Sequence, residues 1–273
     1  MIHPTAIIHP SAQLGEGVHI GPYCVLDGPV VLGAHTVLEP HVVIKGRVTV
    51  GAHCTVGSGT VLGGLPQDLA FQGDTQSGVT IGGHCRLGEH CTVHRGTAEG
   101  TVTTVGDSCF LMAGTHLAHN VQLASRVIIA NNTLLGGYTQ VEEGVFIGGG
   151  CVFHQHVRVG RLAIAQGASA FSKDIPPYTL AAERNLVAGL NVVGLRRAGL
   201  NPSQRLEIKR AFHLLYRQGL NVSQALAAAR EHTWGAEAQA FFDFAAAAKK
   251  RGLCALLRSA RQATGAEADE PAA

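Results

Sequence analysis

This 273-residue chain combines 35 glycines with only 5% aromatic residues, although 46% of its residues are hydrophobic. Ordinary cores rely on aromatic side chains, so this composition favours a repeat architecture packed from small aliphatic residues. The formal net charge of +2 comes without a basic run, which argues against nucleic-acid binding. No apolar run reaches the roughly 18–20 residues of a membrane span, and the N-terminus lacks the pattern of a signal peptide. We therefore expect a cytoplasmic protein without an integral membrane segment.

Aliphatic residues recur at every sixth position, starting with Ile2 and Ile8. The register is lost across residues 63–80, is disturbed again across 96–104, and ends with the weaker members Ala165 and Phe171. The residue two positions before each aliphatic one is usually small, and residues two apart on a strand face the same way, so both should point inward. Gly often follows the aliphatic residue, where we expect it to supply the backbone freedom of a corner. Three hexads would close one triangular coil of a parallel β-helix.

The predicted fold is therefore mainly β, with a β-helix over residues 1–175 and a small C-terminal α-helical domain over residues 176–263. Helical spacing of apolar residues predicts helices over 203–218, 223–232 and 236–251, the second starting at an N-cap at Ser223. These helices should cover one open end of the solenoid. Residues 264–273 are small and acidic, and we expect them to be disordered.

Six cysteines occupy the inward fifth position of their hexads: Cys24, Cys54, Cys85, Cys91, Cys109 and Cys151. They replace the Thr or Val found there in other hexads, and no pair has zinc-ligand spacing. We interpret them as reduced core residues that pack like small apolar side chains, and we expect no metal site.

Two of the 15 histidines stand apart from the rest. Six of the others fall at the fourth hexad position, a corner that should face water. His116 instead points outward from a strand, and His119 lies on the corner that follows this strand. One coil is 18 residues long, so Gly137 should stack directly over His119, and His154 should lie on the same side. An imidazole beside an uncovered glycine N–H is suited to general-base catalysis with an oxyanion donor.

Several segments together resemble the hexapeptide-repeat acyltransferases, most closely the acyl-carrier-protein-dependent UDP-N-acetylglucosamine O-acyltransferases of lipid A biosynthesis. The segments are QDL (67–69), TVHRGT (92–97), HLAH (116–119), ANN (130–132), HQ (154–155), DIPPY (174–178) and GLNVVGLRRAG (189–199). The resemblance implies a left-handed β-helix and a homotrimer with the active site between subunits. It also implies transfer of a 3-hydroxyacyl chain from acyl carrier protein to the sugar 3-hydroxyl, the first step of lipid A biosynthesis, with no cofactor and no metal.

The resemblance also assigns roles to individual residues. His119 matches the catalytic base, Gly137 the oxyanion N–H donor, and Gly167 a residue lining the acyl-chain groove. The substrate-facing set holds the sugar, the nucleotide or the carrier, and consists of Asp68, His116, Tyr138, His154, Gln155, Asn191, Arg196 and Arg197.

Four positions depart from the family's pattern, and they leave alternatives open. Asn120 replaces an Asp and belongs to the catalytic set, while Ala70, Tyr138 and Val193 replace a Lys, a His and an acidic residue. An amide can accept a hydrogen bond from the imidazole but cannot stabilise imidazolium as a carboxylate does. The acceptor could therefore be another nucleotide sugar, for example a 3-amino sugar, or the chain could be a non-catalytic trimer that binds nucleotide and carrier. A zinc lyase of the carbonic anhydrase type shares the β-helix, but its ligand pattern is not visible.

Overall fold

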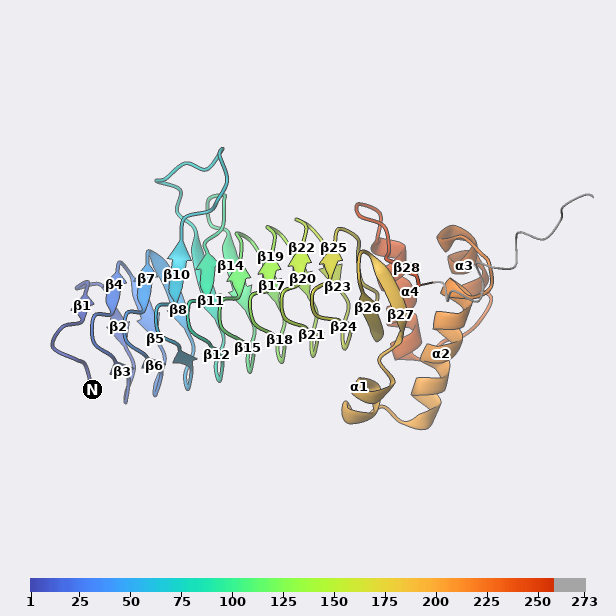
Figure 1. Ribbon diagram of the computed structural model, residues 1–273, viewed down its shortest axis with the longest axis horizontal. Coiled ribbons are helices and arrows are strands. Elements are labelled where there is room, and N and C mark those ends of the chain that lie inside the picture. Colours follow the sequence, from blue (N-terminus) through green and yellow to red (C-terminus); the bar gives the residue numbers. More distant parts are fainter. Residues whose placement is uncertain (258–273) are drawn as a thin grey trace, which may run out of the picture.

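A computed structural model describes residues 1–257, which form a triangular prism of short parallel strands with helices at its C-terminal end (Figure 1). Each strand pairs with the one a coil further on, for example Val25 with Val43. The first sheet has nine strands: β1 (Ile7–Ile8), β4 (Val25–Asp27), β7 (Val43–Lys45), β10 (Val61–Gly64), β13 (Thr92–His94), β16 (His116–Leu117), β19 (Leu134–Leu135), β22 (Val152–Phe153) and β25 (Ala170–Phe171).

The second sheet has eight strands: β2 (Gln13–Leu14), β5 (Val30–Leu32), β8 (Arg47–Val50), β11 (Gly78–Ile81), β14 (Val102–Val105), β17 (Gln122–Leu123), β20 (Gln140–Val141) and β23 (Arg158–Val159). The third has eleven: β3 (His19–Ile20), β6 (Val37–Leu38), β9 (Thr55–Val56), β12 (Arg86–Leu87), β15 (Phe110–Leu111), β18 (Ile128–Ile129), β21 (Phe146–Ile147), β24 (Ile164–Ala165), β26 (Thr179–Ala182), β27 (Leu186–Leu190) and β28 (Ala255–Leu256).

The hexad pattern explains the core. The recurring aliphatic residues are buried, with Leu26, Ile44 and Leu62 fully enclosed, and the six hexad cysteines beside them are buried free thiols. Both inward positions therefore fill the prism interior, because alternate residues of a strand share one face. The predicted parallel β-helix and the packing interpretation of the cysteines are confirmed.

The glycine that often follows the aliphatic residue is not there for backbone freedom, contrary to the prediction from the sequence. A Cβ on Gly15 would lie 2.6 Å from the backbone N of Ala34 in the next coil, and one on Gly57 would lie 2.6 Å from the carbonyl carbon of Gly88. These glycines allow close stacking of coils. Left-handed backbone angles occur instead at the fourth hexad position, for example φ 58° at His35, and most of these histidines are exposed as predicted.

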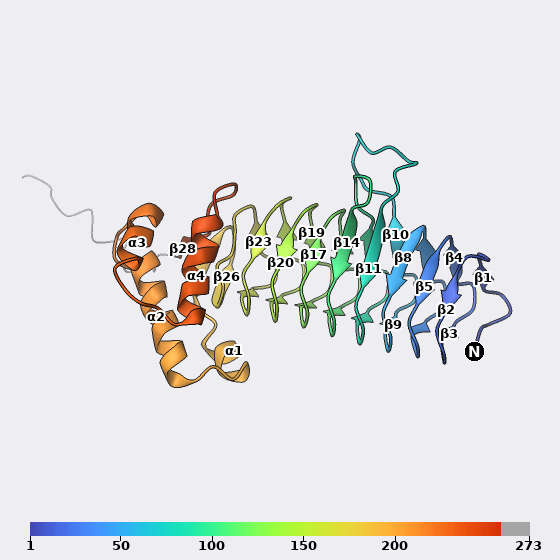
Figure 2. The ribbon, with the colours of Figure 1, turned by 180° about the vertical axis from the view of Figure 1, so that it is seen from behind.

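The C-terminal part contains more sheet than the sequence indicates. β26 continues the third sheet beyond residue 175, and β27 returns antiparallel to it before β28 adds a further strand. Four helices pack at this end of the prism (Figures 1 and 2): α1 (Val192–Arg197), α2 (Pro202–Tyr216), α3 (Val222–Ala229) and α4 (Ala236–Ala247). The N-cap of α3 is Asn221, so the N-cap predicted at Ser223 is wrong. The predicted tail, 264–273, and residues 258–263 lie outside the described residues.

The half-buried guanidinium of Arg158 joins the last coils to the helices and forms an ion pair with the buried carboxylate of Asp174. Arg158 donates from Nε to Asp174 at 2.9 Å and from Nη2 to the carbonyl of Phe244 in α4, whose ring lies 4.2 Å from the guanidinium carbon. Asp174 is only 2% exposed. Within residues 1–257, no helix has both the length and the apolar character needed to cross a membrane.

Candidate active site

The chain turns a corner between successive sheets, and these corners stack into three edges of the prism. The first edge joins the first sheet to the second, the second edge joins the second sheet to the third, and the third edge joins the third sheet back to the first. Two loops, residues 65–77 and 95–101, project from the first edge (Figure 1). The predicted catalytic residues His119, Asn120 and Gly137 lie in corners of this same edge, one coil apart.

The imidazole of His119 lies directly against Gly137, as the 18-residue coil predicts. A Cβ built on Gly137 would lie 2.5 Å from Nε2 of His119, so any larger residue would occupy the position of the ring. The imidazole is 5% exposed, and the ring of Tyr138 meets it edge-on at 5.1 Å. Packing on two sides therefore fixes the ring, with Cε1 and Nε2 as its atoms nearest to the position of that Cβ.

The backbone N–H of Gly137 is free among the described residues, although its carbonyl accepts a hydrogen bond from His156. At the same third hexad position, the N–H groups of Ser58 and Arg161 are bonded by the carboxylates of Glu39 and Glu142, whereas those of Ala34 and Ala113 are, among the described residues, as free as that of Gly137. No side chain of the described residues takes that role at Gly137. A free N–H beside an imidazole is an arrangement that can stabilise negative charge developing on an oxygen.

The hydrogen bonds of Asn120 fix the tautomer of His119. The backbone N–H of Thr97 donates to Asn120 Oδ1 at 3.0 Å, and since a backbone N–H only donates, the amide atom at this place is the oxygen. The same oxygen lies 3.1 Å from Nδ1 of His119. Nδ1 must therefore carry a proton, and in the neutral imidazole Nε2 is then the nitrogen that can accept one.

A chain of hydroxyls supports this arrangement. Thr97 Oγ1 lies 3.0 Å from Asn120 Oδ1 and 2.8 Å from the Tyr138 hydroxyl. Because Oδ1 is an acceptor, Thr97 donates to it and receives the hydrogen bond of Tyr138. Tyr138 is thus held by Thr97 and by stacking on His156, with ring centroids 4.8 Å apart. Thr97 has no role in the sequence-based interpretation, although it ends the TVHRGT segment.

His116 lies on β16, the strand that leads into this corner. Its Nδ1 shares a hydrogen bond with Thr92 Oγ1, and the two atoms are 2.7 Å apart. Its ring contacts that of His94 edge-on at 4.8 Å. Burial lowers the pKa of His116, and burial with the charges of His116 and His119 lowers the pKa of His94 to about 4. His94 Nδ1 is buried without a hydrogen-bond partner in the described residues. Sequence reasoning missed His94, since the second hexad position gave no signal of burial.

The remaining predicted residues divide between the edges. His154 and Gln155 are exposed in the next corner of the first edge, and Asp68 is exposed in the 65–77 loop, where its carboxylate accepts from the Ala70 N–H. No hydrogen bond links these three to His119 in the described residues. Within one chain, His119, Asn120, Gly137 and Tyr138 therefore contact one another, whereas Asp68, His154 and Gln155 make no hydrogen bond to this group.

Gly167, Asn191, Arg196 and Arg197 lie away from the first edge. Gly167 is exposed in a corner of the third edge and stacks on Gly149. Asn191 is 8% exposed, caps α1 through the Gly194 N–H, and donates to the carbonyl of Leu162 at the second edge. Arg196 and Arg197 follow in the last turn of α1 and are exposed. A single chain therefore does not bring these residues to His119.

Comparison with known proteins identifies the family to which this chain belongs. A family model described as Udp N-acetylglucosamine O-acyltransferase, Domain 2, matches residues 174–254, and one described as bacterial transferase hexapeptide (six repeats) matches 29–64 and 103–137. An acyl-[acyl-carrier-protein]–UDP-N-acetylglucosamine O-acyltransferase of Janthinobacterium sp. (strain Marseille) is 41% identical over 227 residues, covering 82% of this chain and 86% of the relative. The chain belongs to this O-acyltransferase family.

Solved structures of UDP-N-acetylglucosamine acyltransferases agree with the assignment. The enzyme from Bacteroides fragilis has a TM-score of 0.88 at 35% identity, covering 94% of this chain and all of that one. The Francisella novicida enzyme also has a TM-score of 0.88, at 30% identity with 96% of each chain covered. The match to a relative from Gloeothece citriformis is 40% identical and spans 61% of that relative's length. The predicted membership of the O-acyltransferase family is confirmed.

Proposed function

We propose that this chain transfers a 3-hydroxyacyl group from acyl carrier protein to the 3-hydroxyl of UDP-N-acetylglucosamine, the first step of lipid A biosynthesis. The observation that carries the proposal is the His119 imidazole, which lies against Gly137 and has Nδ1–H held by Asn120, while the N–H of Gly137 has no partner among the described residues. The names of the relatives supply the donor and the acceptor. No cofactor or metal takes part in this proposal, since the thioester donor is already activated.

The geometry supports a simple acyl transfer. Nε2 of His119 accepts the proton of the sugar hydroxyl as its oxygen attacks the thioester carbonyl carbon, and the Gly137 N–H stabilises the resulting oxyanion. When the tetrahedral intermediate collapses, the C–S bond breaks, and the imidazolium returns the proton to the leaving thiolate. Asn120 keeps the ring in the required tautomer, but it adds no negative charge to stabilise the imidazolium, so we expect slower turnover than with a carboxylate.

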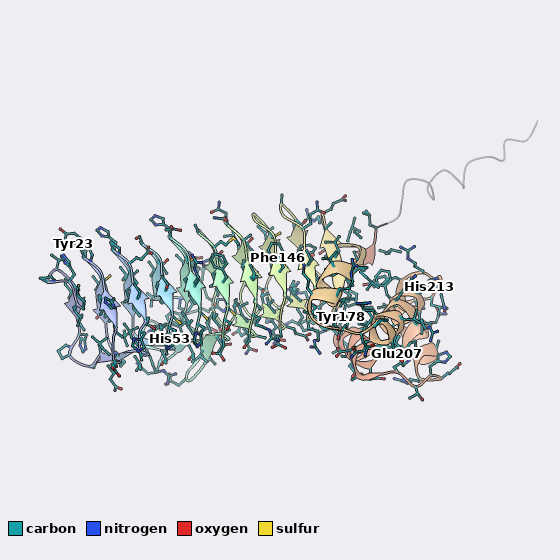
Figure 3. The ribbon with its side chains drawn as sticks, turned by 90° about the horizontal axis from the view of Figure 1, so that it is seen from below. Tyr23, His53, Phe146, Tyr178, Glu207 and His213 are labelled. Atoms are coloured by element: carbon teal, nitrogen blue, oxygen red, sulfur yellow. The ribbon has the colours of Figure 1, made fainter. Side chains whose placement is uncertain are left out.

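The outer faces of the prism support a homotrimer. Outward residues of the first sheet are aliphatic at Val25, Val43, Leu134 and Val152, and those of the third sheet include Val37, Phe110, Ile128, Phe146 and Ile164. Of these residues, Phe146 is labelled in Figure 3. Outward residues of the second sheet are mostly polar, with Val31 as an exception: Gln13, Thr49, Thr104, Gln122, Gln140 and Arg158. Two apolar faces that meet at one edge are suited to a closed three-fold assembly, in which the first sheet of each subunit packs on the third sheet of the next.

Such a trimer would also complete the site. With the third edge at the three-fold axis, the first edge of one subunit lies beside the second edge of its neighbour. His119 would then face Asn191, Arg196 and Arg197 of the adjacent chain, which supports their proposed role at the nucleotide. The acyl chain would run between the two apolar faces toward Gly167 at the third edge. The free cysteines support our proposal of a cytoplasmic location.

Mass spectrometry of the products tests this function. The protein is incubated with a panel of 3-hydroxyacyl carrier proteins and an equimolar mixture of UDP-N-acetylglucosamine and its 3-amino analogue. We expect the O-acylated nucleotide, and its loss in His119→Ala but not in His53→Ala, which removes an exposed corner histidine. Exclusive N-acylation would move the acceptor to an amino sugar, and nucleotide binding without any product would favour a non-catalytic trimer. Size-exclusion chromatography with light scattering tests the trimer in parallel.

A further inference from the structure

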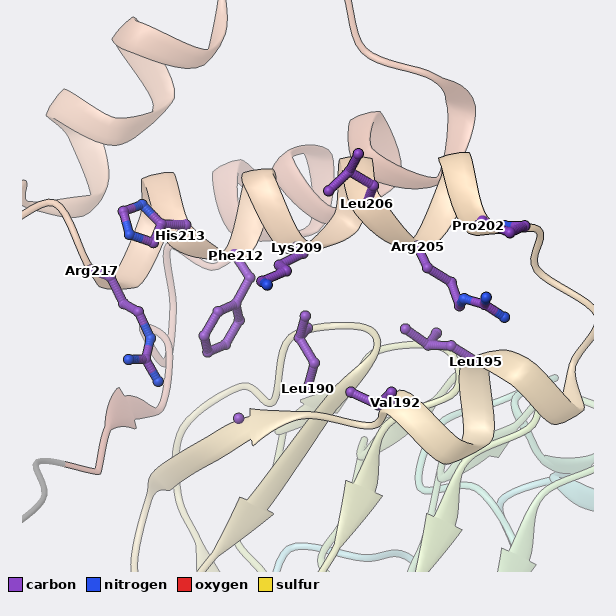
Figure 4. A pocket seen from close by; sticks show the side chains of 11 residues that line it. Leu190, Val192, Leu195, Pro202, Arg205, Leu206, Lys209, Phe212, His213 and Arg217 are labelled. Carbon is purple, nitrogen blue, oxygen red and sulfur yellow. The ribbon is translucent and has the colours of Figure 1, made fainter.

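A cavity of about 620 Å³ lies between α2 and the segment formed by β27 and α1, away from the His119 corner (Figure 4). Its apolar lining includes Leu190, Leu195 and Phe212, and it continues onto Val192 and Leu206. Val192 is 53% exposed and Leu206 48%, so this apolar surface is not covered by the rest of the described chain. The volume falls in the range of pockets that bind small molecules.

Basic side chains line the α2 side of this cavity at intervals of four residues: Arg205, Lys209, His213 and Arg217. Residues four apart lie on the same face of a helix, and the like charges of Arg205 and Lys209 at that spacing repel one another. No Asp or Glu lines the cavity, and none of these four residues takes part in an ion pair among the described residues. A bound anion would relieve the repulsion that the chain itself leaves uncompensated.

We propose that this cavity binds a single-chain amphiphile with an anionic head group, a carboxylate or a phosphate. The alkyl chain packs between Leu190, Leu195 and Phe212, and the head group is held by Arg205 and Lys209 through charge-assisted hydrogen bonds. The site is separate from the proposed acyl groove, because Gly167 lies at the third edge of the prism. It also does not depend on which sugar the enzyme acylates.

Calorimetric titration of the intact protein tests the proposal, with dodecanoate and dodecyl phosphate kept below their critical micelle concentrations. Octyl glucoside supplies a chain without charge, and butyrate a charge without a long chain. We expect both dodecyl anions to bind at one site per chain and the two partial probes to bind at least about tenfold more weakly. The ratio of carboxylate to phosphate affinity identifies the preferred head group.

Paired charge reversals on α2 locate the site. Lys209→Glu should weaken dodecanoate binding at least about tenfold. Arg210→Glu is the matched control, because Arg210 is exposed and lines a different depression, and this variant should leave dodecanoate binding unchanged. Melting curves confirm that both variants fold. Equal losses in the two variants, displacement of dodecanoate by saturating UDP-N-acetylglucosamine, or binding only to anionic vesicles would each overturn the proposal. Retained affinity in Lys209→Glu would overturn it as well.

Discussion

Gly137→Ala is the most direct test of the geometry around His119. The backbone angle of Gly137 is one that alanine can adopt, because it does not lie in the left-handed region, so the added methyl acts only through space. It would lie 2.5 Å from Nε2, whereas ordinary contact begins near 3.4 Å. The imidazole must therefore move by about 1 Å, against Tyr138 and the Asn120 hydrogen bond, and a misplacement of that size costs roughly 10²-fold in rate.

We expect kcat/KM of Gly137→Ala to fall about 10²-fold, equivalent to about 2.7 kcal/mol of transition-state stabilisation. Overpacking should also lower the free energy of unfolding by about 1–3 kcal/mol. Gly83→Ala is the matched control, since Gly83 occupies the same hexad position in another corner and its added Cβ would lie 3.3 Å from the nearest atom, the Ala52 carbonyl oxygen. Steady-state kinetics and urea denaturation of both variants provide the measurement. If Gly137→Ala kept activity within threefold of the parent, the imidazole could not lie over Gly137 during catalysis.

Thr97, His94 and Asp174 provide tests that are independent of Gly137. Thr97→Val removes the hydroxyl between Tyr138 and the catalytic amide, and should lower kcat/KM several-fold and stability by about 1 kcal/mol, unlike Thr101→Val in the same loop. Burial lowers the pKa of His94 from its usual 6.5 to about 4. Between these pH values the unfolded chain therefore binds a proton at His94 that the folded state does not bind. Stability should therefore fall as pH drops from 6.5 to 4, and less steeply in His94→Leu. Asp174→Ala should cost about 3 kcal/mol in urea denaturation, because it leaves a half-buried guanidinium unpaired.

Each prediction has an outcome that contradicts it. Equal kinetic losses in Thr97→Val and Thr101→Val would show that the hydroxyl chain has no special role. Thermal melts of His94→Leu with an unchanged slope between pH 6.5 and 4 would place the responsible proton on another group. A change below 1 kcal/mol in Asp174→Ala would mean that water reaches Arg158 freely.

Much of the fold could be predicted from the sequence, because the interactions that determine it are local and recur every six residues. Alternation along a strand directs the first and fifth residues of each hexad inward, so Leu26 and Cys24 could be placed in the core without knowledge of distant contacts. The 18-residue coil likewise predicted that Gly137 would lie over His119. The helix ends were less accurate, and the N-cap of α3 fell at Asn221, because Ser and Asn compete for caps on similar terms.

The chemistry around His119 was decided by tertiary contacts. The residue that orients Asn120 is Thr97, 23 positions earlier, and the partner of Thr97 is Tyr138, 41 positions later. Neither spacing is a multiple of the coil, because the 95–101 loop brings Thr97 back to the edge. The tautomer of His119, the burial of His94 and the cavity beside α2 all arise in the same way. A repeat determines which way each side chain points, whereas hydrogen bonding and desolvation depend on which side chains meet across insertions and between elements, and only the folded chain settles that.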